Sequence, residues 1–250
     1  MVKKTVTKIL ICAVLFGSIF GNVVLANQLI SLNSKTQQCY KKVSDGTKKT
    51  INIEADLIAS IPEEKIYVYG LNEDKTDGRY KNVILSINGI NKVFNWRTLV
   101  GLVGLEEQYL PKLNLSDLNN DGKKELVIVL KEAGGTGISI NTVHIINPEN
   151  FTEYKVEDPL DIINKNISTK ISSKEIEILK NGTIEKSFAN DYDISKVFFE
   201  DYINYAILEN NKLQAEVGIE FNQRGYLGSI IIEYSFNDGV FKADKISITE

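Results

Sequence analysis

The sequence predicts a mainly β protein, a β-rich α+β fold of antiparallel hairpins and a C-terminal meander with one or two short helices. Three observations support this fold class. Short runs of β-branched and aromatic residues recur from residue 51 onward. Asn-Gly and Asp-Gly pairs separate several of these runs, and both residue types accept the positive φ of a two-residue hairpin turn. Apolar residues at helical spacing are sparse.

Residues 1–26 predict a secretory signal peptide. Lys3, Lys4 and Lys8 precede the apolar run ILICAVLFGSIFGNVVLA, and small residues near its end favour cleavage after Ala26. An uncleaved membrane anchor stays open as an alternative, because 18 apolar residues are the lower limit of a spanning helix. We therefore expect a secreted, extracellular or cell-wall-associated protein.

The charge of the remaining chain limits its partners. Residues 1–26 contain three lysines and no acidic residue, so their removal changes the net charge from −4 to −7. This balance argues against nucleic acid and anionic lipid as partners, because both require clustered Lys and Arg. No later stretch is apolar enough to span a membrane. Cys39 is then the single thiol, so no internal disulfide is expected, and we interpret it as unpaired.

The first half of the chain predicts a linker followed by hairpins. Residues 27–50 are polar and lack a sustained period, which indicates an N-terminal linker. Residues 65–72 and 82–88 predict strands joined by a solvated turn at 73–78. Asn88-Gly89 then predicts a tight hairpin to the next strand. A short helix is expected within residues 96–110.

The second half predicts one further helix and more antiparallel strands. Strands at 125–130 and 142–147 flank an expected loop over 131–141 that contains GGTG at 134–137. Residues 158–167 predict a helix with Pro159 at an early position. Asn181-Gly182 predicts a second hairpin, and the last four strands predict the meander, at residues 202–209, 212–221, 228–236 and 240–248. We expect one β-rich domain over 51–250, or two lobes at 51–157 and 158–250.

One loop carries a clear chemical signal. Residues 116–130 read SDLNNDGKKELVIVL, with Asp117, Asn119 and Asp121 at alternate positions before a strand. Gly122 permits a sharp turn, and the Lys123 carbonyl and the Glu125 carboxylate follow it. Ca²⁺ takes six to eight oxygen ligands, and this spacing directs several oxygens to one point. An EF-hand is excluded, because position 12 of the loop is apolar and a strand follows instead of a helix.

The segment DLNNDGKKEL, followed by the strand VIVL, resembles the calcium loops of FG-GAP/VCBS-type repeats. Those repeats are extracellular β-rich modules of integrin-like propellers and of many secreted bacterial proteins. The resemblance implies Ca²⁺ as a structural ion, with ligands from Asp117, Asn119, Asp121, Lys123 (carbonyl) and Glu125. Only one copy is present, so a full propeller is not expected. The whole chain resembles secreted proteins of low-GC Gram-positive bacteria that carry a single such loop. A metal-free Asn/Asp-Gly turn is the alternative.

Other candidate sites lack supporting context. His144 is the only histidine, so a zinc site of two or more histidines is excluded, and no nucleophile elbow accompanies it. GGTG at 134–137 lacks the residues of a phosphate loop, and we interpret it as a flexible connection. An aromatic-rich patch is expected to pack in the core, with a sugar-stacking platform as the alternative, and comprises Tyr192, Phe198, Phe199, Tyr202 and Tyr205.

Two functions remain open from the sequence. The first is a secreted or cell-envelope calcium-binding module with a binding or structural role, whose partner is a protein or cell-wall glycan. The alternative is a secreted carboxylate-dependent hydrolase, for example one acting on glycans, with a structural calcium ion. Paired carboxylates for glycoside hydrolysis need a defined spatial separation, which a sequence does not reveal. We favour the non-enzymatic module, because no catalytic constellation is visible.

Overall fold

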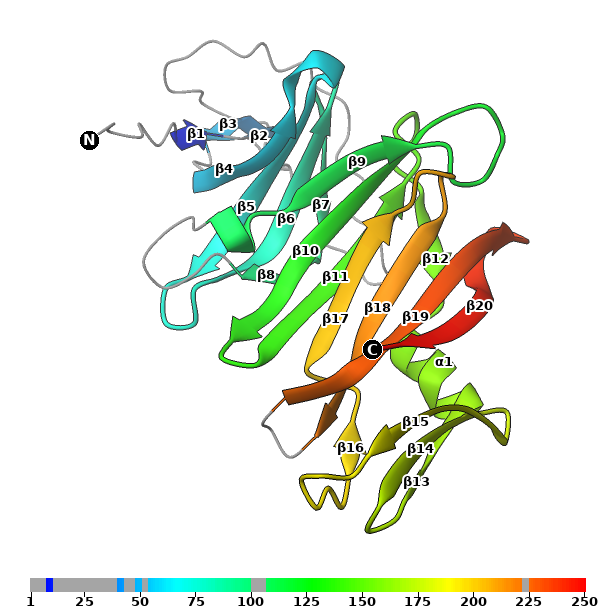
Figure 1. Cartoon of the computed structure of the whole chain (residues 1–250). Helices are drawn as coiled ribbons and strands as arrows, with labels where there is room; N and C mark the ends of the chain where they lie inside the picture. Colours follow the sequence, from blue (N-terminus) through cyan, green and yellow to red (C-terminus); the bar gives the residue numbers. More distant parts are fainter. Residues whose placement is uncertain (1–7, 11–39, 43–47, 51–53, 100–106, 222–224) are drawn as a thin grey trace. The chain divides into compact units, whose positions relative to one another are not determined.

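A computed structural model describes residues 8–10, 40–42, 48–50, 54–99, 107–221 and 225–250 (Figure 1). The chain divides into two compact units, Met1–Leu113 and Asn114–Glu250. The lobe boundary expected at residue 157 therefore falls inside the second unit. Strands make up most of the described residues of both units, so the predicted mainly β class is confirmed. None of the helices in the described segments has the length and apolar character needed to cross a membrane.

The first unit contains an antiparallel sheet in the order β1-β4-β5-β6-β7, with β8 paired to β6. Its strands are β1 (Lys8–Leu10), β4 (Glu54–Ile61), β5 (Ile66–Asp74), β6 (Arg79–Ile87), β7 (Ile90–Phe94) and β8 (Thr98–Leu99). Val68, Tyr69, Ile84 and Leu85 are all buried, so both faces of the β5–β6 pair are covered. A short 3₁₀ helix, η1 (Pro62–Glu64), connects β4 to β5.

The hairpin predicted at Asn88-Gly89 is confirmed. Ile87 pairs with Ile90 across the turn, so the two turn residues are the only ones between the strands. Asn88 has φ of 51° and Gly89 has φ of 80°, the left-handed values that both residue types tolerate. The local chemistry of these two residues therefore sets the register of β6 against β7.

Two expectations concern the parts of the first unit with the weakest sequence patterns. A short helix was expected within residues 96–110, whose described part holds strand β8 and a 3₁₀ helix, η2 (Glu107–Tyr109), while 100–106 lie outside the described residues. The polar linker expected at 27–50 contains a two-stranded sheet of β2 (Tyr40–Lys42) and β3 (Lys48–Thr50). Cys39 lies outside the described residues. Most of the predicted signal peptide does too, apart from β1, which pairs with β4.

The second unit is built on a nine-stranded sheet in the order β12-β20-β19-β18-β17-β11-β10-β9, with β16 paired to β18. The bounds are β9 (Lys112–Ser116), β10 (Glu125–Gly135), β11 (Ile138–Ile146), β12 (Glu153–Val156), β16 (Val197–Phe198), β17 (Tyr202–Ile207), β18 (Leu213–Phe221), β19 (Gly225–Asn237) and β20 (Val240–Thr249). Strand β12 also pairs with β11, so the sheet curves back on itself. Most pairs are antiparallel, but β11–β17 and β12–β20 are parallel.

Alternating side chains of the long strands form the core of the second unit. In β18 these are Leu213, Ala215, Val217 and Ile219, which are all buried. Residues from β19 and from helix α1 (Pro159–Asn166) join the same core. The helix predicted at 158–167 is thus confirmed, and Asp158 caps it by accepting a hydrogen bond from the Leu160 N–H at 2.8 Å.

A small three-stranded sheet follows the helix, formed by β13 (Ile167–Ile171), β14 (Glu175–Lys180) and β15 (Thr183–Ala189). Asn181 and Gly182 have φ of 50° and 81°, and they connect β14 to β15 as the sequence predicts. The expected loop at 131–141 is wrong, because β10 and β11 continue through most of it. GGTG is therefore the tip of a hairpin, with only Thr136 and Gly137 between the strands.

Candidate metal centre

The loop predicted to bind calcium connects β9 to β10 in the second unit. Its backbone takes left-handed conformations at Asn120 (φ 58°) and Gly122 (φ 84°). These two positions turn the chain sharply within a few residues, because asparagine and glycine tolerate positive φ better than other residues do. The structure brings the side chains of Asp117, Asn119 and Asp121 inward at this turn.

Each of the alternating side chains accepts hydrogen bonds from the backbone of the loop itself. Asp117 accepts from the N–H groups of Asp121 at 3.2 Å and Gly122 at 3.0 Å. Asn119 Oδ1 accepts from the Asp121 N–H at 2.9 Å, and Asp121 Oδ1 accepts from the Lys123 N–H at 2.8 Å. The period-two pattern seen in the sequence is therefore a pattern of side chains that cap successive loop amides.

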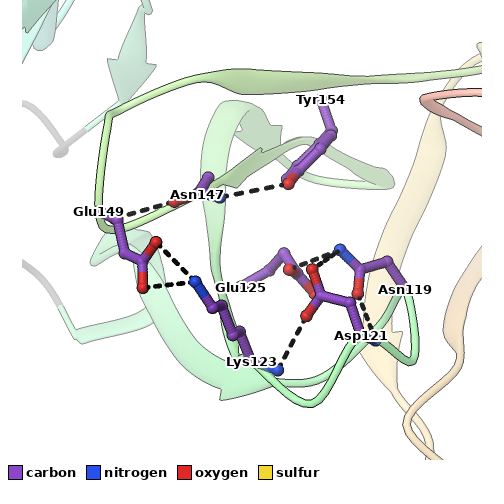
Figure 2. A network of polar contacts seen from close by, with 7 residues as sticks. All are labelled: Asn119, Asp121, Lys123, Glu125, Asn147, Glu149 and Tyr154. Carbon is purple, nitrogen blue, oxygen red and sulfur yellow. Dashed lines mark hydrogen bonds and ion pairs between the residues drawn. The ribbon is translucent and has the colours of Figure 1, made fainter.

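Glu125 is the buried centre of the loop, with 1% of its surface exposed. Its Oε2 atom accepts from the Leu118 N–H at 2.9 Å, and its Oε1 accepts from Asn119 Nδ2 at 3.0 Å. The same Nδ2 donates to Asp121 Oδ2 at 3.1 Å. Figure 2 shows this amide nitrogen between the two carboxylates. Carboxylates from the middle and the end of the loop thus converge on one positively polarised group.

The electrostatics of the loop disfavour a bare negative charge at Glu125. Burial raises the pKa of Glu125, and the nearby Asp121 and Asp117 carboxylates raise it as well. The Leu118 N–H acts in the opposite direction, because it stabilises the carboxylate form. A cation bound in the loop would offset the negative charge of these three acidic groups.

The donor set fits a hard cation. The five predicted positions offer three carboxylates, one amide oxygen and one backbone carbonyl, all of them oxygen ligands. In the described conformation these carboxylates face N–H donors. Accordingly, among the residues that the structure describes, no group of three or more His, Cys, Asp or Glu side chains is already assembled around one point.

A second loop contacts the candidate centre, and the sequence did not predict this contact. Lys123 Nζ lies 2.9 Å from both carboxylate oxygens of Glu149, in the turn between β11 and β12. Asn147 accepts from the Glu149 N–H at 2.9 Å and donates to Tyr154 Oη at 3.4 Å (Figure 2). Only the carbonyl of Lys123 was considered as functional from the sequence, because no local pattern indicates a partner 26 positions away.

The remaining sequence candidates lie apart from this loop or have structural partners. His144 Nδ1 is 2.7 Å from Glu153 Oε1, within hydrogen-bond distance between β11 and β12. The core role expected for Tyr205 is confirmed, since it is buried in the second unit. For Tyr192 it is wrong, because 72% of its surface is exposed and its ring stacks on Phe221 at 5.7 Å.

No protein-family model matches the sequence, and no curated protein matches it at a significant level. The resemblance to FG-GAP/VCBS-type calcium loops therefore stays a prediction, carried by the loop residues alone.

Proposed function

We propose that this protein is a calcium-binding module, secreted or held at the cell envelope, in which calcium has a structural role. The observation that carries the proposal is the inward-turned loop with the buried Glu125 carboxylate at its centre. A buried carboxylate beside two others is costly unless a cation or donors compensate it. The Asn119 amide supplies partial compensation in the described conformation, and Ca²⁺ would supply it more strongly.

Asp117, Asn119, Asp121 and Glu125 would hold the ion through their side chains, and Lys123 would hold it through its carbonyl. The ion supplies charge neutralisation there and no chemistry of its own. Glu125 is the first residue of β10, which is hydrogen-bonded to β9 on one side and β11 on the other. A bound ion would therefore stabilise the point at which the chain enters the sheet of the second unit.

The proposal also includes export of the protein and the class of molecule that it binds. The apolar N-terminus favours export, and extracellular calcium is abundant enough for sites of modest affinity. Cleavage after Ala26 would remove β1 and leave β4 at the edge of its sheet. The negative charge of the remaining chain favours a protein or a cell-wall glycan over nucleic acid as the partner.

A calorimetric titration of the ion-free protein with CaCl₂ tests the proposal. We expect one ion per chain, with a Kd on the order of 10⁻⁴–10⁻³ M, the range of extracellular calcium modules. Asp121→Ala should abolish the binding heat. Asp191→Ala, which removes an exposed carboxylate outside the loop, serves as the control and should bind as the wild type does. Equal binding by the wild type and Asp121→Ala would overturn the ligand assignment.

A further inference from the structure

The loop of the candidate metal centre contacts the β17–β18 turn through the last residue of β9. Ser116, which directly precedes the proposed ligand Asp117, is buried, with 4% of its surface exposed. Its hydroxyl donates a hydrogen bond to Asn211 Oδ1 at 2.8 Å. The two residues are 95 positions apart in the chain, and Figure 1 shows the β9–β10 loop and the β17–β18 turn at the same end of the nine-stranded sheet. The topology therefore brings Asn211 to the point where the loop begins.

The backbone of the turn fixes Asn211 in place. Asn211 has a left-handed conformation with φ of 58°, which asparagine tolerates better than most residues. Its N–H donates to the Leu208 carbonyl at 3.0 Å, which closes the turn. A buried hydroxyl that loses its hydrogen-bond partner carries a desolvation cost, so the Ser116 side chain favours the conformation that keeps this bond. The Ser116–Asn211 contact is thus a defined connection between two ordered segments.

The β17–β18 turn is itself held by several neighbours. The Leu208 N–H donates to the Lys212 carbonyl at 2.9 Å, and the Lys212 N–H donates to Asn210 Oδ1 at 3.3 Å. Lys212 Nζ lies 2.9 Å from Asp244 Oδ2 on β20. Leu213, the next residue, is 1% exposed and belongs to the core of the second unit. The turn can therefore support the start of the loop.

Asp117 lies between two residues that attach the loop to the sheet. On one side, Ser116 makes the polar contact with Asn211. On the other side, Leu118 is 6% exposed and belongs to the same core cluster as Leu213. The Leu118 N–H also donates to Glu125 Oε2 at 2.9 Å. The position of the first proposed ligand is thus determined by contacts outside the run of ligands as well as by the loop itself.

The contact of the loop with the β11–β12 turn has a different character. Lys123 and Glu149 form an ion pair at 2.9 Å, but both side chains are exposed. Water screens such a pair, so it holds its residues only weakly. The contact between Ser116 and Asn211 involves a buried donor and lies directly beside a proposed ligand. Of these two contacts, it is the one suited to fix the geometry of the site.

We infer that Asn211 is a positioning residue of the calcium site, which holds the start of the loop through Ser116 and so places Asp117 for the ion. The inference rests on the proposed calcium function and deepens it, because it assigns part of the affinity to a turn outside the loop. A site whose backbone is already ordered loses less conformational freedom on binding. Coupling between two sites is reciprocal, so calcium should in turn stabilise the β17–β18 turn.

Calorimetric titration of four proteins with CaCl₂ tests the inference: the wild type, Ser116→Ala, Asn211→Gly and the double variant. Asn211→Gly removes the side chain, and glycine accepts the φ of 58° without strain. Each single variant should raise the Kd for calcium by about fivefold, the effect of one hydrogen bond. The double variant should bind no more weakly than either single variant, because both substitutions remove the same bond. Lys123→Ala is the control and should change the Kd by less than about threefold.

Amide hydrogen exchange at Asn211 measures the reciprocal effect. Calcium should slow the exchange of this amide several-fold in the wild type, since the ion stabilises the segment that holds the turn. The slowing should be much smaller in Ser116→Ala, where the connection is absent. A residue that only supports the fold would change the Tm in EDTA and leave both the Kd and this calcium response as in the wild type.

The outcomes separate this inference from the proposed function. Calcium binding by the wild type with an unchanged Kd in Ser116→Ala and Asn211→Gly would overturn the positioning role and leave the calcium site intact. Additive losses in the double variant would also overturn it, because the two residues would then act separately. Absence of binding heat in the wild type would overturn the calcium proposal itself, and this inference with it.

Discussion

At the scale of single residues, the calcium loop depends on side chains that satisfy two demands at once. Asn119 accepts a hydrogen bond from the Asp121 N–H and donates to the carboxylates of both Asp121 and Glu125. It is the only neutral side chain among the four predicted side-chain ligands. Its NH₂ group compensates the buried charge in the absence of metal, and its oxygen is a calcium ligand by type.

Asn119→Asp should make the fold more dependent on calcium. Without metal, the variant loses the donor between Asp121 and Glu125 and gains a negative charge beside them. We expect its free energy of unfolding in EDTA to fall by about 1–3 kcal/mol. Millimolar calcium should restore most of this loss. Denaturant titrations measure both values, and Asn150→Asp is the control, because Asn150 lies outside the loop and accepts a bond from the Thr152 N–H.

Lys123→Ala separates the roles of the Lys123 side chain and carbonyl. The ion pair with Glu149 is exposed, with 61% and 62% of the two side chains accessible, so its loss should leave the stability of the fold nearly unchanged. The backbone carbonyl remains, and the calcium affinity should change less than threefold. A much larger loss of affinity in calorimetry would assign the side chain a direct part in the site.

At the scale of elements, the hairpins that the sequence predicted correctly are those with an Asn-Gly pair in the turn. Asn88-Gly89 and Asn181-Gly182 identified their hairpins because few residues tolerate positive φ at successive positions. The end of β10 was missed because Gly134 and Gly135 carry no strand signal, although they pair with Ser139 and Ile138. Their strand conformation depends on pairing with β11 and not on their own residue type.

Gly182→Ala tests whether the second hairpin depends on backbone conformation alone. A Cβ at Gly182 would meet no atom within 4 Å, but its φ of 81° strains any other residue. We expect a loss of about 1 kcal/mol or more in the free energy of unfolding. Gly135→Ala is the matched control, because it adds a Cβ in equally open space at a residue without positive φ. Equal effects would contradict a backbone origin.

At the scale of the whole molecule, the sequence predicted a site whose residues are close together in the chain. It missed contacts between residues that are far apart in the chain. The five loop positions fall in one turn, as their spacing indicated. The Lys123–Glu149 pair and the parallel pairing of β11 with β17 join segments far apart in the chain. Each depends on the topology of the nine-stranded sheet, which no short pattern encodes.

Calcium should stabilise the two units unequally, because its proposed ligands all belong to the second unit. Hydrogen exchange with and without about 2 mM CaCl₂, the range of extracellular calcium modules, measures this difference. We expect slower exchange in β10 and β11 with calcium, and unchanged exchange in β5 and β6. Uniform slowing in all four strands would argue against a site in the loop.

Thermal unfolding of the purified chain in EDTA and then in about 2 mM CaCl₂ tests the calcium assignment most directly. A site with a Kd of about 10⁻⁴ M would add about 2 kcal/mol at this concentration, which corresponds to a rise of about 5 °C in Tm. The wild type should show this rise, and Asp121→Ala should show none. An unchanged wild-type Tm, or the same rise in both proteins, would contradict a calcium site at Asp117–Glu125.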